Sequence, residues 1–266
     1  MNLDIIDTHA HLDMSHFNND RDNVIARAKE AGVSRIITIG IDLASNRKAI
    51  QLAQKYPDVL VALGIHPQES TGIQKQTILQ LKEMCQYHKV VGIGETGLDF
   101  FHDNSPHEDQ FKAFNWQLEL AELHGLPVII HSRQALEDTR QVLQKWSSSY
   151  KLPPGKPRGV IHCFSGDLRT ALDYIEMGFY ISVGGYLGYP SSAKLRETIA
   201  GIPVDRLVLE TDCPFLPPQQ FRGKRNEPAY TRITLGIIAE IKGLSHEEIA
   251  ARTTQNAERI FNLSNT

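Results

Sequence analysis

Two histidines, His9 and His11, lie two residues apart near the start of the chain, within the segment "DTHAHLD" (7–13). They follow the apolar run 3–6, which is typical of a buried strand. In an extended backbone residues i and i+2 face the same side, so both imidazoles would point toward one ion. On a helix they would lie roughly 200° apart and could not share it. The pair indicates half of a metal site, and the alternative is a chance placement in a surface turn.

Polar groups of the same kind follow other apolar runs. They are His66, Glu95, Asp99, His131, His162 and Asp212, at or just after the ends of runs 59–64, 90–94, 128–130, 159–162 and 206–209. Imidazoles and carboxylates both bind divalent ions such as zinc or manganese. With His9 and His11, and even without His66 and Asp99, they make six ligands, more than the four that one tetrahedral ion requires. Two neighbouring divalent ions, Mg, Mn or Zn, would use them all and could activate water for hydrolysis.

The apolar runs must form neighbouring strands if these side chains are to meet. The runs are short, rich in Val and Ile, and lack polar alternation, as in parallel strands covered on both faces. We expect strands at 3–6, 36–40, 59–64, 90–94, 128–130, 159–162, 179–183 and 206–209. We expect helices at 20–31, 46–56, 76–88, 107–124, 137–146, 169–177 and 192–200, and a last helix that Ser245 opens. Ser105 is expected to be the N-cap of the helix at 107–124.

Eight strands that alternate with helices predict a (β/α)₈ barrel of the TIM type, as one domain over residues 1–266. A barrel gathers the C-terminal ends of its strands around one mouth, where active sites lie. The competing fold is an open doubly wound sheet, which the lack of a GxGxxG segment after the first strand disfavours.

Charge and cysteine content bear on the possible partners and on the cellular compartment. The net charge is −3, so a polyanion would have to be held by local cations. The three cysteines are far apart and form no CxxC pair, which favours a reducing compartment and argues against a disulfide scaffold or a zinc ribbon. The N-terminal segment lacks the pattern of a signal peptide, and no apolar run approaches the ~20 residues of a membrane span. We therefore expect a cytoplasmic protein.

The polar segments resemble those of the TatD-related DNase family, within the amidohydrolase-like metal hydrolases. The resemblance covers nearly the whole chain. It rests on "DTHAHLD" (7–13), "GIHP" (64–67), "GETGLDF" (94–100), "PVIIHSR" (127–133), "IHCFSG" (161–166), "ETDCPFL" (210–216) and "RNEP" (225–228). It implies a TIM-type barrel that holds divalent metal and hydrolyses phosphodiester bonds in DNA. It further implies 3′-to-5′ exonuclease action on single strands or DNA ends.

The resemblance also implies a role for each matching residue. The implied metal ligands are His9, His11, Glu95, His131, His162 and Asp212. Glu95 would bridge one ion, held by His9 and His11, to a second held by the two later histidines. Asp212 would also orient or deprotonate the attacking water. His66 would face the substrate without a metal role. Two other functions stay open: hydrolysis of a small amide, ester or lactone on the same barrel, and metal binding without catalysis.

Several cations near these motifs are candidates for phosphate contacts. Arg133 follows His131 by two residues, so it would share its direction, with an ordinary salt bridge as the alternative. The segment "FRGKRNEP" (221–228) supplies Arg222, Lys224 and Arg225 to a long loop on the catalytic face. A solvated charged loop is the alternative there.

The neighbours of the motifs are open to structural interpretations. Asp99 either orients a metal-binding histidine or caps the loop after "GETG". We expect Glu210 to support an Arg or Lys, and Cys163 and Cys213 to turn away from the metals as small core residues. The aromatic pair at 100–101 is interpreted as core at the barrel rim, with stacking on a nucleobase as the alternative.

Overall fold

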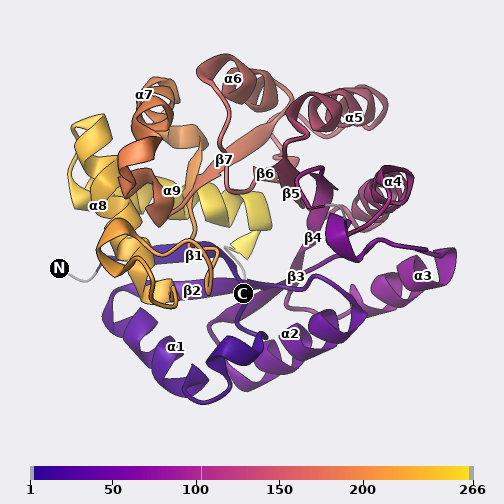
Figure 1. Cartoon of the computed structure of the whole chain (residues 1–266), viewed down its shortest axis with the longest axis horizontal. Coiled ribbons are helices and arrows are strands. Elements are labelled where there is room, and N and C mark those ends of the chain that lie inside the picture. Colours follow the sequence, from indigo (N-terminus) through magenta and orange to yellow (C-terminus); the bar gives the residue numbers. More distant parts are fainter. Residues whose placement is uncertain (1–2, 103, 264–266) are drawn as a thin grey trace.

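The computed structural model describes residues 3–102 and 104–263. Eight parallel strands follow one another in chain order around a single sheet, and helices cover the outside (Figure 1). The strands are β1 (Ile5–Ala10), β2 (Val33–Ile39), β3 (Val59–Leu63), β4 (Val90–Asp99), β5 (Val128–Arg133), β6 (Gly159–Ile161), β7 (Phe179–Val183) and β8 (Leu207–Leu209). The helices are α1 (Arg21–Glu30), α2 (Leu43–Lys55), α3 (Lys75–Met84), α4 (His107–His124), α5 (Leu136–Ser149), α6 (Leu168–Glu176), α7 (Ala193–Gly201), α8 (Thr231–Lys242) and α9 (His246–Phe261).

The sheet curls until its last strand meets its first. Ala10 at the end of β1 forms a parallel bridge with Cys213, just past β8. The backbone N–H of His11 donates to the Cys213 carbonyl at 2.8 Å, and that of Asp212 donates to the His9 carbonyl at 2.9 Å. These bonds join the two ends of the sheet, so the architecture is the predicted TIM-type barrel. The competing open sheet is wrong for this chain.

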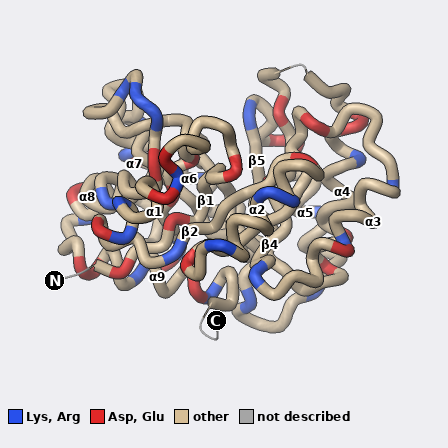
Figure 2. Tube along the Cα trace, turned by 90° about the horizontal axis from the view of Figure 1, so that it is seen from below, with Lys and Arg blue, Asp and Glu red and all other residues tan. Residues whose placement is uncertain are grey.

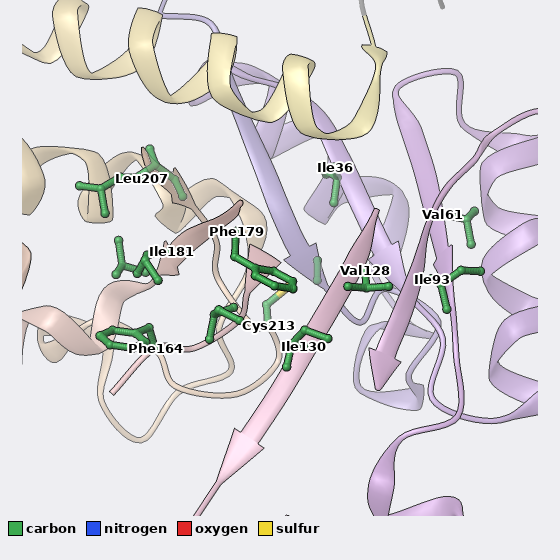
Figure 3. Close-up of a cluster of buried hydrophobic side chains, with 14 of the residues drawn as sticks. Ile36, Val61, Ile93, Val128, Ile130, Phe164, Phe179, Ile181, Leu207 and Cys213 are labelled. Atoms are coloured by element: carbon green, nitrogen blue, oxygen red, sulfur yellow. The ribbon is translucent and has the colours of Figure 1, made fainter. Parts of the chain in front are cut away.

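Alternation along the strands divides the buried apolar side chains into two clusters. Ile36 on β2 belongs to the larger cluster, between strands and helices, part of which Figure 3 shows. Its neighbour Ile37 points the other way, into the smaller cluster inside the barrel. That smaller cluster also contains Ile260 and Phe261 of α9.

Helix α9 closes the end of the barrel at which the strands begin. The Asn256 side chain donates to the carbonyl of Leu207, the first residue of β8, at 2.8 Å. The Thr254 hydroxyl donates to the carbonyl of Asp4, just before β1, at 2.7 Å. Figure 1 shows α9 beside β1. Apolar side chains therefore fill this end of the barrel, and the polar groups lie at the opposite end, where the strands finish.

Several elements differ from the sequence-based expectation. The first, fourth and fifth strands run further than their apolar residues, because polar side chains also point into the barrel mouth. Ser105 is not the N-cap of α4, since Pro106 occupies that position and the Ser105 hydroxyl donates to the Gln68 carbonyl instead. Helix α8 had no counterpart in the expected elements. Ser245 does cap α9, where its hydroxyl accepts from the Glu248 N–H at 3.1 Å.

Charges of both signs are mixed over the molecule. Figure 2 shows Lys and Arg segments among Asp and Glu segments on the side that it presents. Among the described residues, no helix combines the length and the apolar character that crossing a membrane requires.

Candidate metal centre

Glu95 lies in the middle of the cluster of candidate ligands. It is a buried residue of β4, and its two carboxylate oxygens face different histidines. Oε2 lies 3.3 Å from His9 Nε2 and 3.7 Å from His11 Nε2. Oε1 lies 2.6 Å from His131 Nδ1 and 3.6 Å from His162 Nε2. One carboxylate therefore stands between two pairs of imidazoles that the sequence spaces far apart.

His9 and His11 meet as the i, i+2 spacing predicts. Their Nε2 atoms lie 3.2 Å apart. Asp212 Oδ1 completes this side of the cluster, at 3.7 Å from His9 Nε2 and 3.5 Å from His11 Nε2. Asp212 reaches this position because its backbone takes the left-handed conformation, with φ +58°. A non-glycine residue is uncommon in that conformation, and such residues gather at functional sites.

In His11, His131 and His162, a hydrogen-bond acceptor contacts the ring nitrogen that points away from Glu95. His11 Nδ1 lies 3.1 Å from the Ile39 carbonyl, which accepts only if this nitrogen carries the proton. His162 Nδ1 lies 2.8 Å from Glu210 Oε2, and His131 Nε2 lies 3.1 Å from Asp99 Oδ2. A proton on each outer nitrogen leaves a lone pair on the nitrogen that faces Glu95.

The sequence anticipated one of these acceptors, Asp99, and misjudged the other, Glu210. The expectation that Glu210 supports an Arg or Lys is wrong, because its carboxylate contacts His162 and accepts from the Cys163 N–H at 2.8 Å. Asp99 fulfils both of the alternatives, since its Oδ1 also accepts from the N–H groups of Phe101 and His102 at 3.0 Å. The signal for Glu210 was its position directly after the apolar run 206–209, where the other candidate groups also follow their runs.

Cys163 also differs from its expected position. Alternation would turn its thiol away, but the chain leaves β6 after Ile161 and Cys163 takes φ +46°. Its Sγ lies within 4.8 Å of ligand atoms of His162 and Asp212. Cys213, in contrast, is fully buried in the core, as expected (Figure 3).

Burial and neighbouring charge set the protonation of the cluster. Burial lowers the pKa of His66 to about 3, and His131 adds to the shift, so His66 is neutral near pH 7. Burial alone would raise the pKa of Glu95, but the surrounding imidazoles hold it well below its usual range. His66 Nε2 lies 3.4 Å from His131 Nδ1 and 3.7 Å from Glu95 Oε1. His66 therefore offers a neutral imidazole beside an ionised carboxylate.

These donors fit divalent metal. The groups whose ligand atoms lie within 4.8 Å of one another include His9–His11–Asp212, His9–Glu95–His162 and His66–Asp99–His131. Imidazole nitrogens and carboxylate oxygens suit zinc and manganese, and the oxygens alone also suit magnesium. His9 Nδ1 is buried without a hydrogen-bond partner among the described residues, so this ring is not oriented as its neighbours are.

The candidate phosphate contacts lie in different situations. Arg225 is not a free cation as the sequence suggested, because it pairs with Asp20 at 2.7 Å and stacks on Phe17. Arg133 is exposed, with its guanidinium 4.0 Å above the Phe101 ring and 2.9 Å from His102 Nε2. Lys224 and Arg222 are exposed on the loop after β8. Their charged groups lie over aromatic rings, and within the described part of the chain no carboxylate forms an ion pair with them.

Comparison with known proteins identifies the family. The model of the TatD related DNase family matches residues 6–262. The chain belongs to this family of metal-dependent hydrolases. It is 39% identical to YabD of Bacillus subtilis, named an uncharacterized metal-dependent hydrolase, over 98% of this chain and all of the relative. It is 36% identical to a protein of Erwinia tasmaniensis named "3'-5' ssDNA/RNA exonuclease TatD", over 97% of this chain and all of that one.

A solved structure has the same fold. The crystal structure of YjjV, a TatD homologue of Escherichia coli, superposes with a TM-score of 0.91 at 34% identity. The superposition covers 98% of this chain and 99% of YjjV. The barrel and the order of its strands are thus shared by a relative of known structure.

Proposed function

We propose that this TatD-family hydrolase is a deoxyribonuclease that removes nucleotides from the 3′ ends of DNA. The observation that carries the proposal is the position of Glu95, with one oxygen toward His9 and His11 and the other toward His131 and His162. Such a carboxylate suits two neighbouring divalent ions. A pair of ions clamps the attacking and leaving oxygens of a phosphodiester and lowers the pKa of water.

Other steps of the reaction would depend on side chains: activating the water, contacting the substrate and orienting the metal ligands. Asp212 is 13% exposed as a side chain, so it is reachable from the mouth, and its pKa lies below its usual range despite burial, because of His11 and His162. An ionised carboxylate there would orient the attacking water and accept its proton. His66 is neutral and would donate a hydrogen bond to the substrate phosphate. Glu210 and Asp99 would keep His162 and His131 in position.

Two further points favour a nucleic-acid substrate. Relatives that match along their whole length are named single-strand DNA and RNA exonucleases. Arg133 is exposed at the end of β5, and Arg222 and Lys224 are exposed on the loop after β8, all at the mouth of the barrel. Cations at this end would hold the phosphates next to the scissile one. Arg225 has no such part, because Asp20 holds it.

The test is to strip the protein with a chelator and restore Mg, Mn or Zn singly. A single-stranded oligonucleotide labelled at its 5′ end should then shorten in steps from the 3′ end, only when metal is present. A parallel assay offers small esters, amides and lactones. Metal-dependent turnover of one of those, with the oligonucleotide left intact under every metal, would contradict the nuclease proposal.

A further inference from the structure

An exposed aromatic ring lies beside the candidate metal centre. Phe215 follows β8 by six residues and is 44% exposed. Its ring centroid lies 6.1 Å from that of His11, with an interplanar angle of 68°, and 6.2 Å from that of His16. Among the described residues, the other large apolar side chains that are exposed to a comparable degree are Leu79, Phe101, Leu123, Leu168 and Leu172. Phe215 differs from them by its contact with a candidate metal ligand.

The backbone that carries Phe215 is firmly held. Its N–H donates to the Asp212 carbonyl at 2.9 Å. Its carbonyl accepts from Asn226 Nδ2 at 2.7 Å, and the same amide donates to the Thr211 carbonyl at 2.8 Å. Asn226 is fully buried, and its own N–H donates to the Pro214 carbonyl at 3.0 Å. The ring is therefore exposed on a preorganised segment rather than on a loose loop, which lowers the entropy cost of binding.

Folding does not account for this placement. A phenylalanine gains stability for the fold by being buried, yet this one stays partly in water at the polar mouth of the barrel. Its two ring contacts are edge-to-face, and both partners are histidines rather than core residues. A flat apolar surface next to a centre for phosphodiesters is suited to the other half of a nucleotide, the base.

We infer that Phe215 is a stacking platform for an unpaired nucleobase that flanks the scissile phosphate. This inference rests on the proposed nuclease function and makes it more specific. A base inside a duplex has both faces covered by its stacked neighbours, so the platform favours unpaired bases near the 3′ end. Stacking of a base on an aromatic side chain tolerates all four bases, which suits an enzyme that degrades any sequence.

The experiment compares three 5′-labelled single strands that differ only near the 3′ end. One is unmodified, one carries an abasic tetrahydrofuran residue at the last position, and one carries it at the second-last position. One of the two abasic strands lacks the base that would lie on Phe215. We expect the parent to cleave the unmodified strand with kcat/KM roughly tenfold above that for this abasic strand, mostly through a lower KM. Phe215→Ala should bring that ratio close to one.

Two further substitutions separate stacking from apolar bulk. Phe215→Trp keeps an aromatic face and should keep the ratio, whereas Phe215→Leu should lose most of it. Leu123→Ala is the matched control, because Leu123 is also exposed but lies near the end of α4 that leads into the start of β5. It should behave as the parent does. Metal content, measured for every variant, reports whether His11 is disturbed.

The outcomes distinguish the inference from the proposal beneath it. If the parent cleaves the strands and Phe215→Ala keeps the parent's ratio for both abasic positions, the platform is disproved and the nuclease function stands. If the ratio changes only together with loss of metal, Phe215 acts on His11, and the platform is likewise disproved. A parent that cleaves none of the three strands overturns the nuclease proposal and this inference with it.

Discussion

At the scale of single residues, the candidate ligands depend on the side chains behind them. His162 contacts Glu210 and His131 contacts Asp99, both through the nitrogen that points away from Glu95. Glu210 and Asp99 are fully buried, so their charges act in a medium of low polarity. Residues outside the ligand set should therefore control metal affinity. The sequence suggested this for Asp99 as one of two alternatives, and suggested another role for Glu210.

Replacement of Glu210 tests this dependence. Glu210→Gln keeps the shape of the side chain but removes the charge that holds the His162 proton. We expect the affinity for divalent metal to fall roughly 10- to 100-fold, as is typical when the residue behind a ligating histidine is changed. Competition with a chromophoric chelator measures it. Glu240→Gln, on the exposed face of α8, is the control. Equal affinity in the parent and in Glu210→Gln would show that His162 needs no support.

At the scale of elements, the barrel was predictable because its signal repeats. Each parallel strand leaves a short run of apolar residues, and eight such runs alternate with helical patterns. The ends of elements were less predictable. His9 and His131 lie inside strands, because their polar side chains break the apolar run while the backbone continues its ladder. Their facing followed from alternation all the same.

Backbone conformation and contacts between distant segments explain the errors of the sequence-based predictions. Cys163 and Asp212 leave the alternation through left-handed backbone conformations, which no local pattern announced. Arg225 was counted among free cations because its partner, Asp20, lies far away in the chain. The roles of the six candidate ligands, of His66 and of the phosphate contacts remain predictions.

A glycine in β4 allows that strand to carry two functional residues. Gly97 lies between Glu95 and Asp99, has φ +144°, and a Cβ there would lie 2.0 Å from the His131 carbonyl oxygen. Gly97→Ala should therefore lower the free energy of unfolding by about 2–4 kcal/mol. Gly236→Ala, inside α8, should raise it by about 0.5–1 kcal/mol, because a Cβ there would meet only His246, at an ordinary contact distance of 3.6 Å. Urea unfolding measures both, and equal effects would contradict the argument.

Arg222 and Lys224, on the loop after β8, are the two candidate phosphate contacts of this loop that form no ion pair within the described residues. Replacing Arg222 and Lys224 together by alanine removes two exposed charges. If they bind phosphates, DNA affinity should fall and its dependence on salt should become shallower, with a log–log slope smaller by roughly 1.4–1.8. Binding measured by fluorescence anisotropy at several salt concentrations provides the slope. Arg225→Ala is the contrasting variant, because its charge is already neutralised by Asp20. An unchanged slope in the double variant would place the DNA elsewhere.

At the scale of the whole molecule, the candidate centre joins strands from all around the barrel. Its donors come from β1, β4, β5 and the segments after β6 and β8, so an ion would link elements distant in the chain. A ligand that binds only the folded state stabilises it by about 2.7 kcal/mol at a hundred times its Kd. Chelation should therefore lower Tm by roughly 5–10 °C.

Thermal unfolding with and without chelator measures this shift. Glu95→Gln should lose most of the difference, because Glu95 contacts both halves of the cluster. The chelator effect should be unchanged in Glu240→Gln. A Tm that is indifferent to chelator in the parent, after metal has been shown to bind, would mean that the ion is held outside this centre.

We propose that the candidate metal centre cleaves DNA and that Asp212 orients the attacking water and accepts its proton. The most direct test is the rate at which Asp212→Asn shortens a 5′-labelled single strand at saturating metal, with metal content measured on the same sample. We predict a rate about 10²–10⁴-fold below that of the parent while the fold and the bound metal are largely kept. A metal-loaded Asp212→Asn that degrades the strand as fast as the parent would show that Asp212 has no such role.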